Sequence, residues 1–402
     1  MKILQIISSF PPAYSYGGPL QVAYNLSKNL VKQGDEVTVY STDVLDQTHR
    51  NKNVENPGFL DGIKIFRFKN INNRLASKYR ISCAPRIAYA LNLNIKNYDI
   101  VHCHEYRAFE AIVMHHYAKK YHIPYIVQAH GAVLPVFEKQ GIKKIYDILW
   151  GNQILRDASK LIAVSKVEKD QYLKMGMPEN KIVIIPNGID VSEYETLPER
   201  GIFRKKYGIA SDEKVVLYLG RLHKRKGIDF LINTFSSLLD LKKDNKLIIA
   251  GPDDGFLEIL MEIIKKLKIG KNVLVTGSLS KVEKIEAFVD ADVLVYPGIL
   301  EIFGLVPFEA IMCGTPVIVT DDCGCGEVIK EAKCGYLVKY GDTDDLRGRI
   351  LNVLNDDIQS NLFVRDGQKF IKDNLSWSYL IEVVKQTYLE CISQSNGVKH
   401  EL

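Results

Sequence analysis

Residues 296–309 place two carboxylates on either side of a turn that leads from an apolar run into a helical pattern. Glu301 precedes the turn, and Glu309 would lie in the first turns of the helix. The backbone N–H groups of Phe303, Gly304 and Leu305 would then point out of a helix N-terminus, where anions and sugar hydroxyls bind readily. In the simpler interpretation, Glu309 only complements the helix dipole and Glu301 is exposed to solvent.

A basic loop at residues 220–227 follows the first apolar run of the second half of the chain. Arg221 offers a planar guanidinium to phosphate oxygens and Lys226 offers a compact point charge, so together they suit a diphosphate. The loop would lie at the carboxyl edge of a strand, where doubly wound sheets bind ligands. The alternative is a solvated basic loop before a helix, which the position of the loop disfavours.

Two further segments follow apolar runs in the first half of the chain. Gly17 and Gly18 lack a Cβ and would let the backbone approach a ligand closely. The G-x-G-x-x-G spacing is absent after either first strand, which argues against a nicotinamide or flavin oxidoreductase. His130, followed by Gly131, would stand at the carboxyl end of a strand, although a lone histidine is more often structural than catalytic.

Short apolar runs alternate with helical periodicity along the chain, which predicts parallel sheets covered by helices on both faces. The first series predicts strands at 2–7, 36–41, 64–68, 100–102, 125–128, 161–164 and 182–185, with helices at 20–33 and 84–92. The second predicts strands at 214–219, 246–250, 273–276, 293–296 and 317–320, with helices at 228–240, 256–267, 281–288, 307–313 and 344–354.

The repeated pattern predicts two similar doubly wound α/β domains, at residues 1–190 and 200–375. Turn residues at 186–190 and a polar stretch at 192–200 would form the linker between them. Apolar spacing over 376–393 predicts a terminal helix that packs back on the first domain.

The length of 402 residues fits two domains, and 46% hydrophobic and 25% charged residues are typical of a globular protein. The apolar run at 2–7 is short and lacks a cleavage site, so we interpret it as a buried strand rather than as a signal peptide. No stretch approaches the roughly 20 apolar residues that span a bilayer. Seven cysteines without an export signal favour the reducing cytosol. We therefore expect a cytoplasmic protein.

Most of the net charge of +5 is concentrated in residues 62–98, which contain no Asp or Glu. Its cations are Lys64, Arg67, Lys69, Arg74, Lys78, Arg80, Arg86 and Lys96. One interpretation is an ordinary solvated surface. The other is a surface for anionic lipid or for a phosphate-bearing partner. We expect no nucleic-acid partner, because interleaved exposed aromatics and a nucleic-acid-binding motif are both absent.

The four segments together resemble glycosyltransferase family 4, a large family of retaining enzymes with the two-domain GT-B fold. The resemblance covers essentially the whole chain and includes PNGID at 186–190, GTPVI at 314–318 and GYLV at 335–338. Each motif is weak alone, whereas their order and spacing together are specific. The resemblance implies two tandem Rossmann-like domains with a cleft between them, the first binding the acceptor and the second the nucleotide sugar.

The resemblance also implies roles for individual residues. Arg221 and Lys226 would bind the diphosphate. Glu301 would contact the donor sugar, Glu309 the nucleotide ribose, and His130 the transferred sugar beside the reacting carbon. The expected catalytic residues are His130, Arg221, Lys226 and Glu301. Further donor contacts are expected from Gly17, Gly18, Phe303, Gly304 and Leu305, and the base would lie near Gly251, Thr276 and Leu279.

Residues 323–327 depart from the family pattern, because CGCGE stands where two adjacent glycines usually precede the glutamate. Glu327 is therefore left out of the expected site. Cys323, Cys325 and Cys334 lack a fourth ligand at suitable spacing, so a zinc site is not expected.

Two aspartate pairs, 290/292 and 342/344, match the D-x-D pattern of metal-dependent sugar transferases of the other main fold. The first leads into an apolar strand and the second begins a helix, where Asp is a common cap. We therefore expect no metal and no other cofactor, the nucleotide sugar being a co-substrate. Arg221, Lys226 and the helix N-terminus would hold the departing diphosphate charge.

Retention of configuration needs either a carboxylate nucleophile or attack from the same face as the leaving group. The sequence offers no convincing nucleophile, so we follow the family and expect same-face attack, with the leaving phosphate taking the proton of the acceptor. A lipid-linked saccharide is the favoured acceptor, with membrane contact through residues 62–98. The alternative is a non-catalytic nucleotide-sugar-binding protein of the same fold, although both cations and both glutamates are present.

Overall fold

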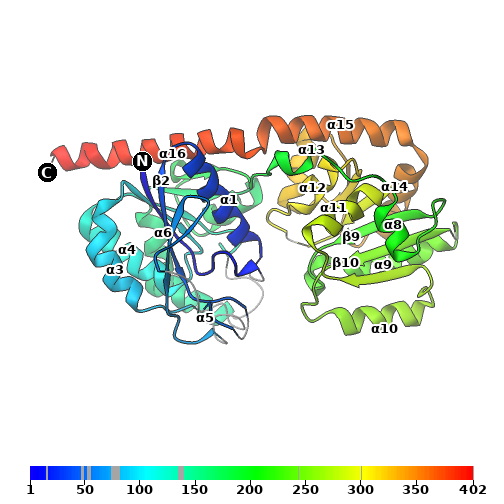
Figure 1. Ribbon diagram of the computed structural model, residues 1–402, viewed down its shortest axis with the longest axis horizontal. Helices are drawn as coiled ribbons and strands as arrows, with labels where there is room; N and C mark the ends of the chain where they lie inside the picture. Colours follow the sequence, from blue (N-terminus) through cyan, green and yellow to red (C-terminus); the bar gives the residue numbers. More distant parts are fainter. Residues whose placement is uncertain are drawn as a thin grey trace. The chain divides into compact units, whose positions relative to one another are not determined.

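The computed structural model describes residues 1–14, 17–46, 49–51, 56–73, 82–134, 140–242, 244–299 and 301–401. The chain divides into two compact units (Figure 1). Unit 1 comprises Met1–Gly188 and Trp377–Leu402, and unit 2 comprises Ile189–Ser376. Each unit is a Rossmann-like sheet with flanking helices, so the predicted fold class of two tandem α/β domains is confirmed.

Unit 1 contains an eight-stranded sheet in the order β3-β4-β2-β1-β5-β6-β7-β8. Neighbouring strands are parallel except for β3 and β4. The strands are β1 (Lys2–Ile6), β2 (Glu36–Thr42), β3 (Gly58–Leu60), β4 (Ile63–Phe68), β5 (Ile100–His104), β6 (Tyr125–Gln128), β7 (Lys160–Ala163) and β8 (Ile182–Ile184). The helices are α1 (Gly18–Lys32), α3 (Arg86–Asn94), α4 (Phe109–Tyr121), α5 (Gln140–Tyr146), α6 (Asn152–Asp157), α7 (Lys166–Lys174) and α16 (Trp377–Glu401).

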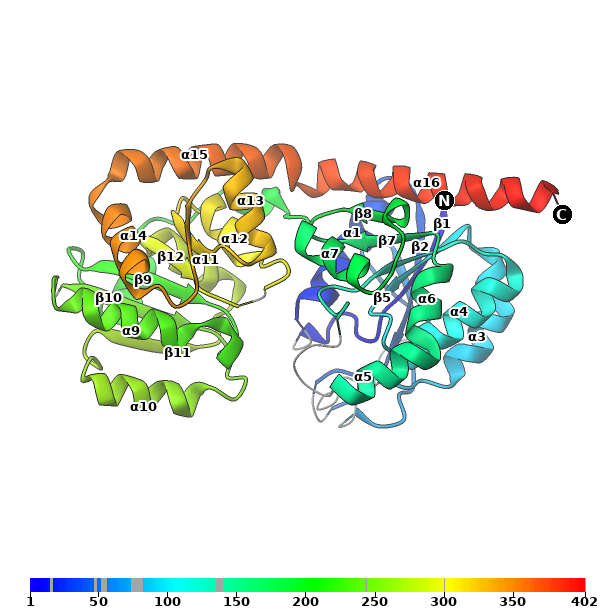
Figure 2. The same cartoon turned by 180° about the vertical axis from the view of Figure 1, so that it is seen from behind.

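The two faces of this sheet pack against different helices, because alternate residues of a strand point to opposite faces. Leu4 and Ile6 of β1 belong to a core shared with α3, α4, α6 and α7, the helices that Figure 2 shows. Ile3 belongs to a second core shared with α1 and α16. Burying each of these aliphatic side chains contributes about 1.5–3 kcal/mol.

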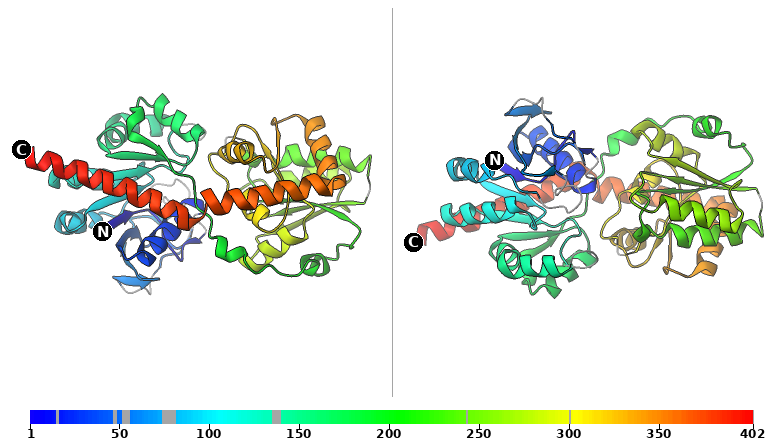
Figure 3. Two further views of the ribbon diagram at one scale, coloured as in Figure 1. Left: turned by 90° about the horizontal axis from the view of Figure 1, so that it is seen from above. Right: turned by 90° about the horizontal axis from the view of Figure 1, so that it is seen from below.

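The terminal helix expected over 376–393 is α16, which packs beside α1 in the second core of unit 1 (Figure 3). Its Leu380, Val384 and Tyr388 are buried there. The helix starts at Trp377, whose ring lies so close to Gly188 that a Cβ on that glycine would be 2.6 Å from it. The start of α16 is thus packed against the end of the first chain segment of unit 1.

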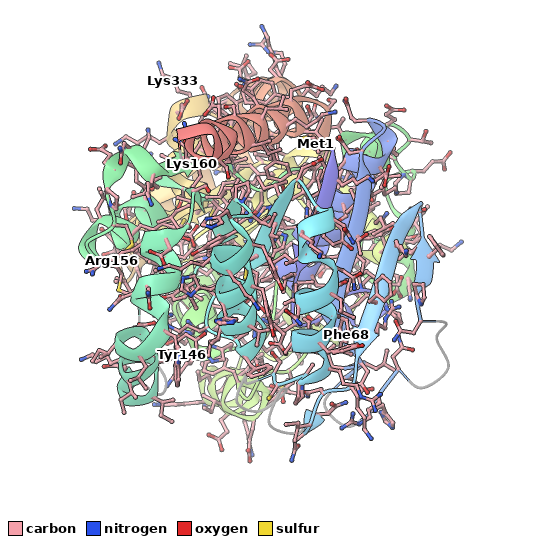
Figure 4. All side chains as sticks on the ribbon, turned by 90° about the vertical axis from the view of Figure 1, so that its left-hand side faces the viewer. Met1, Phe68, Tyr146, Arg156, Lys160 and Lys333 are labelled. Atoms are coloured by element: carbon pink, nitrogen blue, oxygen red, sulfur yellow. The ribbon has the colours of Figure 1, made fainter. Side chains whose placement is uncertain are left out.

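Parallel pairing gathers the carboxyl ends of the strands at one edge of the sheet. In Figure 4, Met1 and Lys160, at the starts of β1 and β7, lie at one edge, and Phe68, which ends β4, lies at the opposite edge. The loops that carry Gly17 and His130 leave β1 and β6 at the edge marked by Phe68. Doubly wound sheets bind ligands at this carboxyl edge.

Unit 2 contains a six-stranded parallel sheet in the order β11-β10-β9-β12-β13-β14. The strands are β9 (Lys214–Leu219), β10 (Asn245–Ala250), β11 (Val273–Gly277), β12 (Val293–Tyr296), β13 (Val317–Thr320) and β14 (Tyr336–Val338). The helices are α8 (Ile202–Tyr207), α9 (Ile228–Leu239), α10 (Leu257–Leu267), α11 (Lys281–Asp290), α12 (Val306–Met312), α13 (Gly324–Ala332), α14 (Thr343–Asn355) and α15 (Asp357–Asn374). Helices α9, α10 and α14 share one core with the sheet, and α11 and α12 also contact its strands.

The polar part of the expected linker, residues 192–200, is packed as part of unit 2, which begins at Ile189. Residues Val191–Tyr194 form a 3₁₀ turn, and Tyr194 is buried. Glu193 pairs with Lys281 at 2.7 Å, and Arg200 pairs with Asp292 at 2.7 Å. Turn residues and polar side chains are equally compatible with a free linker and with a surface segment, so the sequence pattern could not separate the two.

Candidate active site

The candidate site of unit 2 lies at the carboxyl edge of its sheet, around β9 and β12. Successive strands run outward from β9 through β10 to β11 on one side and from β12 through β13 to β14 on the other. The strand order therefore reverses between β9 and β12, which is the position where open α/β sheets bind ligands. The predicted diphosphate loop follows β9, and the segment with both glutamates follows β12.

An ion pair between Lys226 and Glu301 joins these two loops. The Lys226 ammonium also lies 3.4 Å from the Tyr296 hydroxyl and 5.6 Å from the centre of that ring. Burial, reinforced by the Glu301 charge, raises the pKa of Tyr296, so this hydroxyl stays protonated. The Lys226 and Glu301 side chains are 14% and 22% exposed, so both retain a surface for a ligand.

Backbone contacts hold the two loops in register. The Ile299 N–H donates to the Arg225 carbonyl at 2.9 Å. Gly227 ends the basic turn in the left-handed region at φ 65°, and a Cβ there would lie 2.0 Å from the Pro297 carbonyl oxygen. Only glycine fits this position, because any side chain would collide with the backbone of the facing loop.

Arg221 forms an ion pair with Asp254, which lies in the loop after β10. The Tyr218 hydroxyl donates to the Arg221 carbonyl at 3.0 Å and fixes the turn. With 45% of its side chain exposed, Arg221 is the more accessible of the two predicted diphosphate cations. Sequence reasoning did not single out Asp254, since an exposed aspartate in a loop carries no distinguishing pattern.

Glu309 lies in the first turn of α12, as predicted, and is 17% exposed. Its carboxylate accepts a hydrogen bond from Lys284 of α11 at 2.8 Å. Burial and the Glu309 carboxylate both raise the pKa of the Tyr194 hydroxyl, which lies beside it. Glu309 is therefore more than a helix-dipole partner, and Lys284 and Tyr194 are neighbours that the sequence did not reveal.

The turn between the two glutamates is tightly packed. Phe303 is buried and stacks on Phe308 with the ring centres 5.4 Å apart. A Cβ on Gly304 would lie 2.7 Å from the Tyr296 ring. Leu305 is the N-cap residue of α12 and is half-buried. The turn and the Lys226 ammonium therefore both lie against the Tyr296 side chain.

Thr276 and Leu279, the residues expected near the base, lie at the carboxyl end of the edge strand β11 and in the loop that follows. Both are half-buried, and the Thr276 hydroxyl donates to the Gly277 carbonyl at 3.0 Å. They stand two strands away from β9, or about 10 Å at the usual strand spacing. Gly251 follows the intervening strand β10.

The remaining predicted residues lie in unit 1. Gly17 is the N-cap residue of α1 at φ 88°, and Gly18 is the first residue of that helix. No neighbouring atom would lie within 4 Å of a Cβ on either glycine, so the space in front of this turn is open within the described residues. His130 is half-buried at φ 51°, and burial lowers its pKa to about 3.

The aspartate pairs have structural roles, as their positions predicted. Asp290 accepts from the backbone N–H of Arg204 at 3.0 Å, and Asp292 forms an ion pair with the Arg204 guanidinium at 2.8 Å. Asp342 caps α14 through the N–H of Asp345 at 3.0 Å. Across the described ranges no three His, Cys, Asp or Glu side chains are grouped as metal ligands would be.

The CGCGE segment begins α13, with Cys323 as its N-cap: the thiol accepts from the Gly326 N–H at 3.2 Å. The Cys323 and Cys325 sulfurs are both buried and lie 3.2 Å apart. The hydrogen bond with the Cys323 sulfur, together with burial, raises the pKa of the Cys325 thiol, so it stays protonated. The Gly324 N–H donates to the Glu301 carbonyl at 2.9 Å. This segment departs from the family pattern, yet it still supports the loop that carries Glu301.

The basic segment at 62–98 is described only in part, because Arg74, Lys78 and Arg80 lie outside the described residues. The apolar residues interleaved with these cations, which could add shallow apolar contact with a membrane, also lie outside them: Leu75, Tyr79 and Ile81. Of the rest, Arg67 donates to the Pro11 carbonyl at 2.6 Å, and Lys64 lies over the Phe66 ring at 5.3 Å. No described helix is long and apolar enough to cross a membrane.

Family models match both units. The model described as Glycosyltransferase Family 4 matches residues 16–193, and the model described as Glycosyl transferases group 1 matches residues 199–370. An uncharacterized glycosyltransferase of Methanocaldococcus jannaschii is 27% identical over 397 residues, covering 96% of this chain and 98% of that protein. N-acetyl-alpha-D-glucosaminyl L-malate synthase of Bacillus anthracis is 26% identical over 382 residues, covering 89% of each.

Solved structures share the fold over nearly the whole chain. Sucrose-phosphate synthase of Thermosynechococcus elongatus has a TM-score of 0.78 at 20% identity, covering 98% of this chain and 100% of that one. Anabaena HepE in complex with UDP has a TM-score of 0.77 at 19% identity, covering 97% and 100%. Since glycosyltransferase models match both units and the fold is GT-B, the chain belongs to glycosyltransferase family 4.

Proposed function

We propose that this glycosyltransferase moves a sugar from a nucleoside diphosphate sugar onto a hydroxyl of a saccharide acceptor. The transfer would retain the configuration of the sugar and would need no metal ion. The single observation that carries this proposal is the Lys226–Glu301 pair at the point where the strand order of unit 2 reverses. A cation and a carboxylate held side by side match a donor whose phosphate and sugar hydroxyls are adjacent.

The layout of the other candidates fits the length of a nucleotide sugar. Arg221 stands at the end of β9, and Thr276 stands about 10 Å away at the end of β11, two strand spacings along the edge. Diphosphate bound at β9 and β12 would therefore leave the base near β10 and β11. Glu309 would accept hydrogen bonds from the ribose, and Lys284 holds its carboxylate in place through a hydrogen bond of 2.8 Å.

In this mechanism the protein positions the donor and stabilises charge. Arg221, Lys226 and the turn at 303–305 would hold the negative charge that grows on the diphosphate as the glycosidic bond breaks. The acceptor hydroxyl would attack from the face that the diphosphate leaves, and its proton would pass to the leaving phosphate oxygen. Two basic side chains would supply the stabilisation that a metal ion provides in other transferases.

A nucleotide-sugar panel tests this proposal, with UDP sugars first because HepE was solved with UDP. Lys226→Ala and Arg221→Ala should each lower kcat/KM about 100-fold or more, the scale of a lost transition-state stabiliser. Lys224→Ala, an exposed lysine in the same turn, is the control and should remain active. Binding without turnover of any donor would favour the non-catalytic alternative. Activity lost with chelator and restored by Mg²⁺ or Mn²⁺ would contradict metal independence.

We propose a lipid-linked saccharide as the acceptor, used in glycan or polysaccharide biosynthesis at the cytoplasmic face of a membrane. The structure adds an apolar surface to the predicted basic one. Helix α5 and the following π-helical turn at Asp147–Gly151 carry five large apolar side chains that are 43% to 76% exposed. They are Ile142, Ile145, Ile148, Leu149 and Trp150. Lys143 and Lys144 lie among them, and the one acid of this stretch, Asp147, is buried in an ion pair with Arg107.

Shallow apolar insertion with adjacent lysines suits an anionic lipid surface, where each cation adds about 1 kcal/mol. Tyr146, at the end of α5, lies toward the same edge of the sheet as Phe68 (Figure 4), which is the edge that carries the His130 loop. The α5 surface would thus bring a membrane-held acceptor to the side of unit 1 where we expect acceptor binding.

Co-sedimentation with anionic and neutral vesicles at low salt tests membrane contact. Replacing Ile145 and Ile148 by Ser tests the α5 surface, and replacing Arg74, Lys78 and Arg80 by Ser tests the basic segment. Ile259→Ser, an exposed isoleucine of α10 in unit 2, is the matched control. If the wild type binds neither anionic nor neutral vesicles, the membrane proposal is wrong and the transferase proposal is unaffected.

A further inference from the structure

A connected set of polar side chains lies buried in unit 1 behind His130. Nε2 of His130 is 2.8 Å from Nδ1 of His104, and Nε2 of His104 is 2.6 Å from Oε1 of Gln5. The Gln5 amide nitrogen donates to the Tyr388 hydroxyl at 3.4 Å, and that hydroxyl is 2.6 Å from Nδ1 of His102. His102 and His104 stack at 4.2 Å, and His104 and His130 stack at 5.1 Å.

Elements far apart in the sequence build this chain of contacts. Gln5 lies on β1, His102 and His104 on β5, His130 in the loop after β6, and Tyr388 on α16. Gln5, His104 and Tyr388 are at most 1% exposed, so solvent water does not reach them to exchange protons or hydrogen bonds. The polar atoms of these buried side chains must therefore find their donors and acceptors among one another.

The amide oxygen of Gln5 determines which atoms donate in the two hydrogen bonds that connect Gln5, His104 and His130. Oε1 of Gln5 can only accept, so Nε2 of His104 must carry a proton. Burial lowers the pKa of His104 well below 6.5, so its ring is neutral and Nδ1 bears no proton. That bare nitrogen accepts from Nε2 of His130, which must then be the protonated nitrogen of a neutral ring. Nδ1 of His130 remains as an acceptor, and none of the described residues hydrogen-bonds to it.

We propose that Gln5 and His104 are positioning residues that fix the tautomer of His130, so that His130 presents a bare Nδ1 to its ligand. This proposal rests on the proposed function and on the expectation that His130 contacts the transferred sugar. A bare nitrogen accepts a hydrogen bond, so the group it meets must be a donor. The site therefore favours a sugar with a free hydroxyl at that position over one in which the hydroxyl is replaced by fluorine or hydrogen.

The backbone of His130 is held independently of this chain of contacts. Its φ of 51° lies in the left-handed region, and the N–H of the next residue, Gly131, donates to buried Glu168 at 2.6 Å. The ring can therefore keep its place when its tautomer changes. Variants at Gln5 test the proton position separately from the loop position.

Long-range ¹H–¹⁵N spectra of the full chain labelled on its histidine nitrogens read the tautomer directly, without turnover. The His130 signals, assigned by their loss in His130→Asn, should show a protonated Nε2 and an unprotonated Nδ1 at neutral pH. Gln5→Met removes the acceptor and keeps the side-chain length, so a mixture of the two His130 tautomers is expected. Tyr388→Phe is the matched control: it removes a buried hydroxyl from the same set of contacts, yet leaves Oε1 of Gln5 facing His104.

Kinetics with an accepted donor give the second readout. Gln5→Met should lower kcat/KM about tenfold, the scale of one misdirected hydrogen bond, whereas Tyr388→Phe should stay within about threefold of the wild type. A donor series with one hydroxyl at a time replaced by fluorine should show one position at which the wild type discriminates and Gln5→Met discriminates less. A protonated Nδ1 in the wild type, or equal tautomer shifts in both variants, would overturn the proposal. Absence of turnover with every nucleotide sugar would overturn the proposed function and leave the tautomer result standing.

Discussion

Glu301 and Glu309 are eight positions apart, and each has a different cationic partner. Glu301 pairs with Lys226 at the point where the strand order reverses, and Glu309 pairs with Lys284 at 2.8 Å on the side of α11. A lysine partner takes up one lone pair of a carboxylate and leaves the others free to accept hydrogen bonds from hydroxyls. The two glutamates can therefore bind different parts of one ligand.

We expect Glu309→Gln to weaken binding of the bare nucleoside diphosphate about tenfold, the cost of one charge-assisted hydrogen bond. Glu301→Gln should leave that affinity nearly unchanged and should lower kcat, because this carboxylate would contact the sugar. Isothermal titration with the bare diphosphate, beside turnover with the complete donor, separates the two effects. Equal losses of nucleotide affinity would contradict the assignment of ribose to one residue and sugar to the other.

Glu168 has a carboxylate whose titration is linked to folding. It is fully buried and accepts from the Gly131 and Val164 N–H groups at 2.6 and 2.7 Å. Burial raises its pKa from 4.5 to about 7 against these two hydrogen bonds. The folded protein thus holds this proton more tightly than the unfolded chain, so the stabilisation is complete below pH 4.5 and is lost as the pH rises through about 7.

Glu168→Gln removes this titration. We expect the unfolding free energy of the wild type, relative to the variant, to fall by about 1.4 kcal/mol per pH unit between pH 4.5 and 7. Urea unfolding of both proteins across this range measures the difference. Parallel stability curves would show that Glu168 ionises at its ordinary pKa in the folded protein.

Among the elements, the turn from β9 into α9 depends on a single glycine. Gly227 has φ 65° and faces the Pro297 carbonyl, so a Cβ adds a collision to the strain of the left-handed conformation. Gly208, at the end of α8, has φ 66° and no neighbouring atom within 4 Å of an added Cβ. The two glycines therefore differ in crowding and match in backbone conformation.

Gly208→Ala should cost about 1–2 kcal/mol of stability, the strain term alone. Gly227→Ala should cost about 1–3 kcal/mol more, because the facing loop must move. Since that movement displaces Lys226 from Glu301, we also expect a loss of turnover in Gly227→Ala only. Chemical unfolding and a transfer assay on both variants test this, and equal behaviour of the two would show that the loops are not packed as described.

For the whole molecule, the division into two units predicts separable tasks. Unit 2 is continuous in sequence, and a hydrogen bond of 2.8 Å joins the N–H of its first residue, Ile189, to the carbonyl of its penultimate residue, Leu375. Unit 1 needs α16, because Leu380, Val384 and Tyr388 complete its second core. Residues 1–188 alone would expose that apolar face to water.

We expect residues 189–376 expressed alone to unfold cooperatively and to bind the bare nucleoside diphosphate with an affinity near that of the full chain, without transferring sugar. Lys226→Ala in this fragment is the control for specific binding. Residues 1–188 without α16 should fail to unfold cooperatively. Calorimetry of the two fragments distinguishes these outcomes, and nucleotide binding confined to unit 1 would reverse the assignment of the donor.

The sequence alone determined the architecture and where the residues expected to bind the donor lie along it. Apolar runs that alternate with helical periodicity predict a parallel sheet because each pattern reflects local burial. Parallel strands then bring every loop that follows a strand to one edge, so Arg221, Lys226 and Glu301 could be placed together without knowing any contact. The D-x-D pairs were likewise assigned to structural positions from the elements that follow them.

Only the tertiary structure decided the partners and the exposures. The pairs Lys226–Glu301, Glu309–Lys284 and Gln5–His104 join residues 75, 25 and 99 positions apart, and such pairings depend on how elements pack. For the same reason, the sequence did not predict that residues 192–200 pack as part of unit 2. The apolar spacing of residues 142–149 is that of a core helix, and only the folded chain shows this face exposed, because burial depends on what packs against a helix as well as on its own pattern.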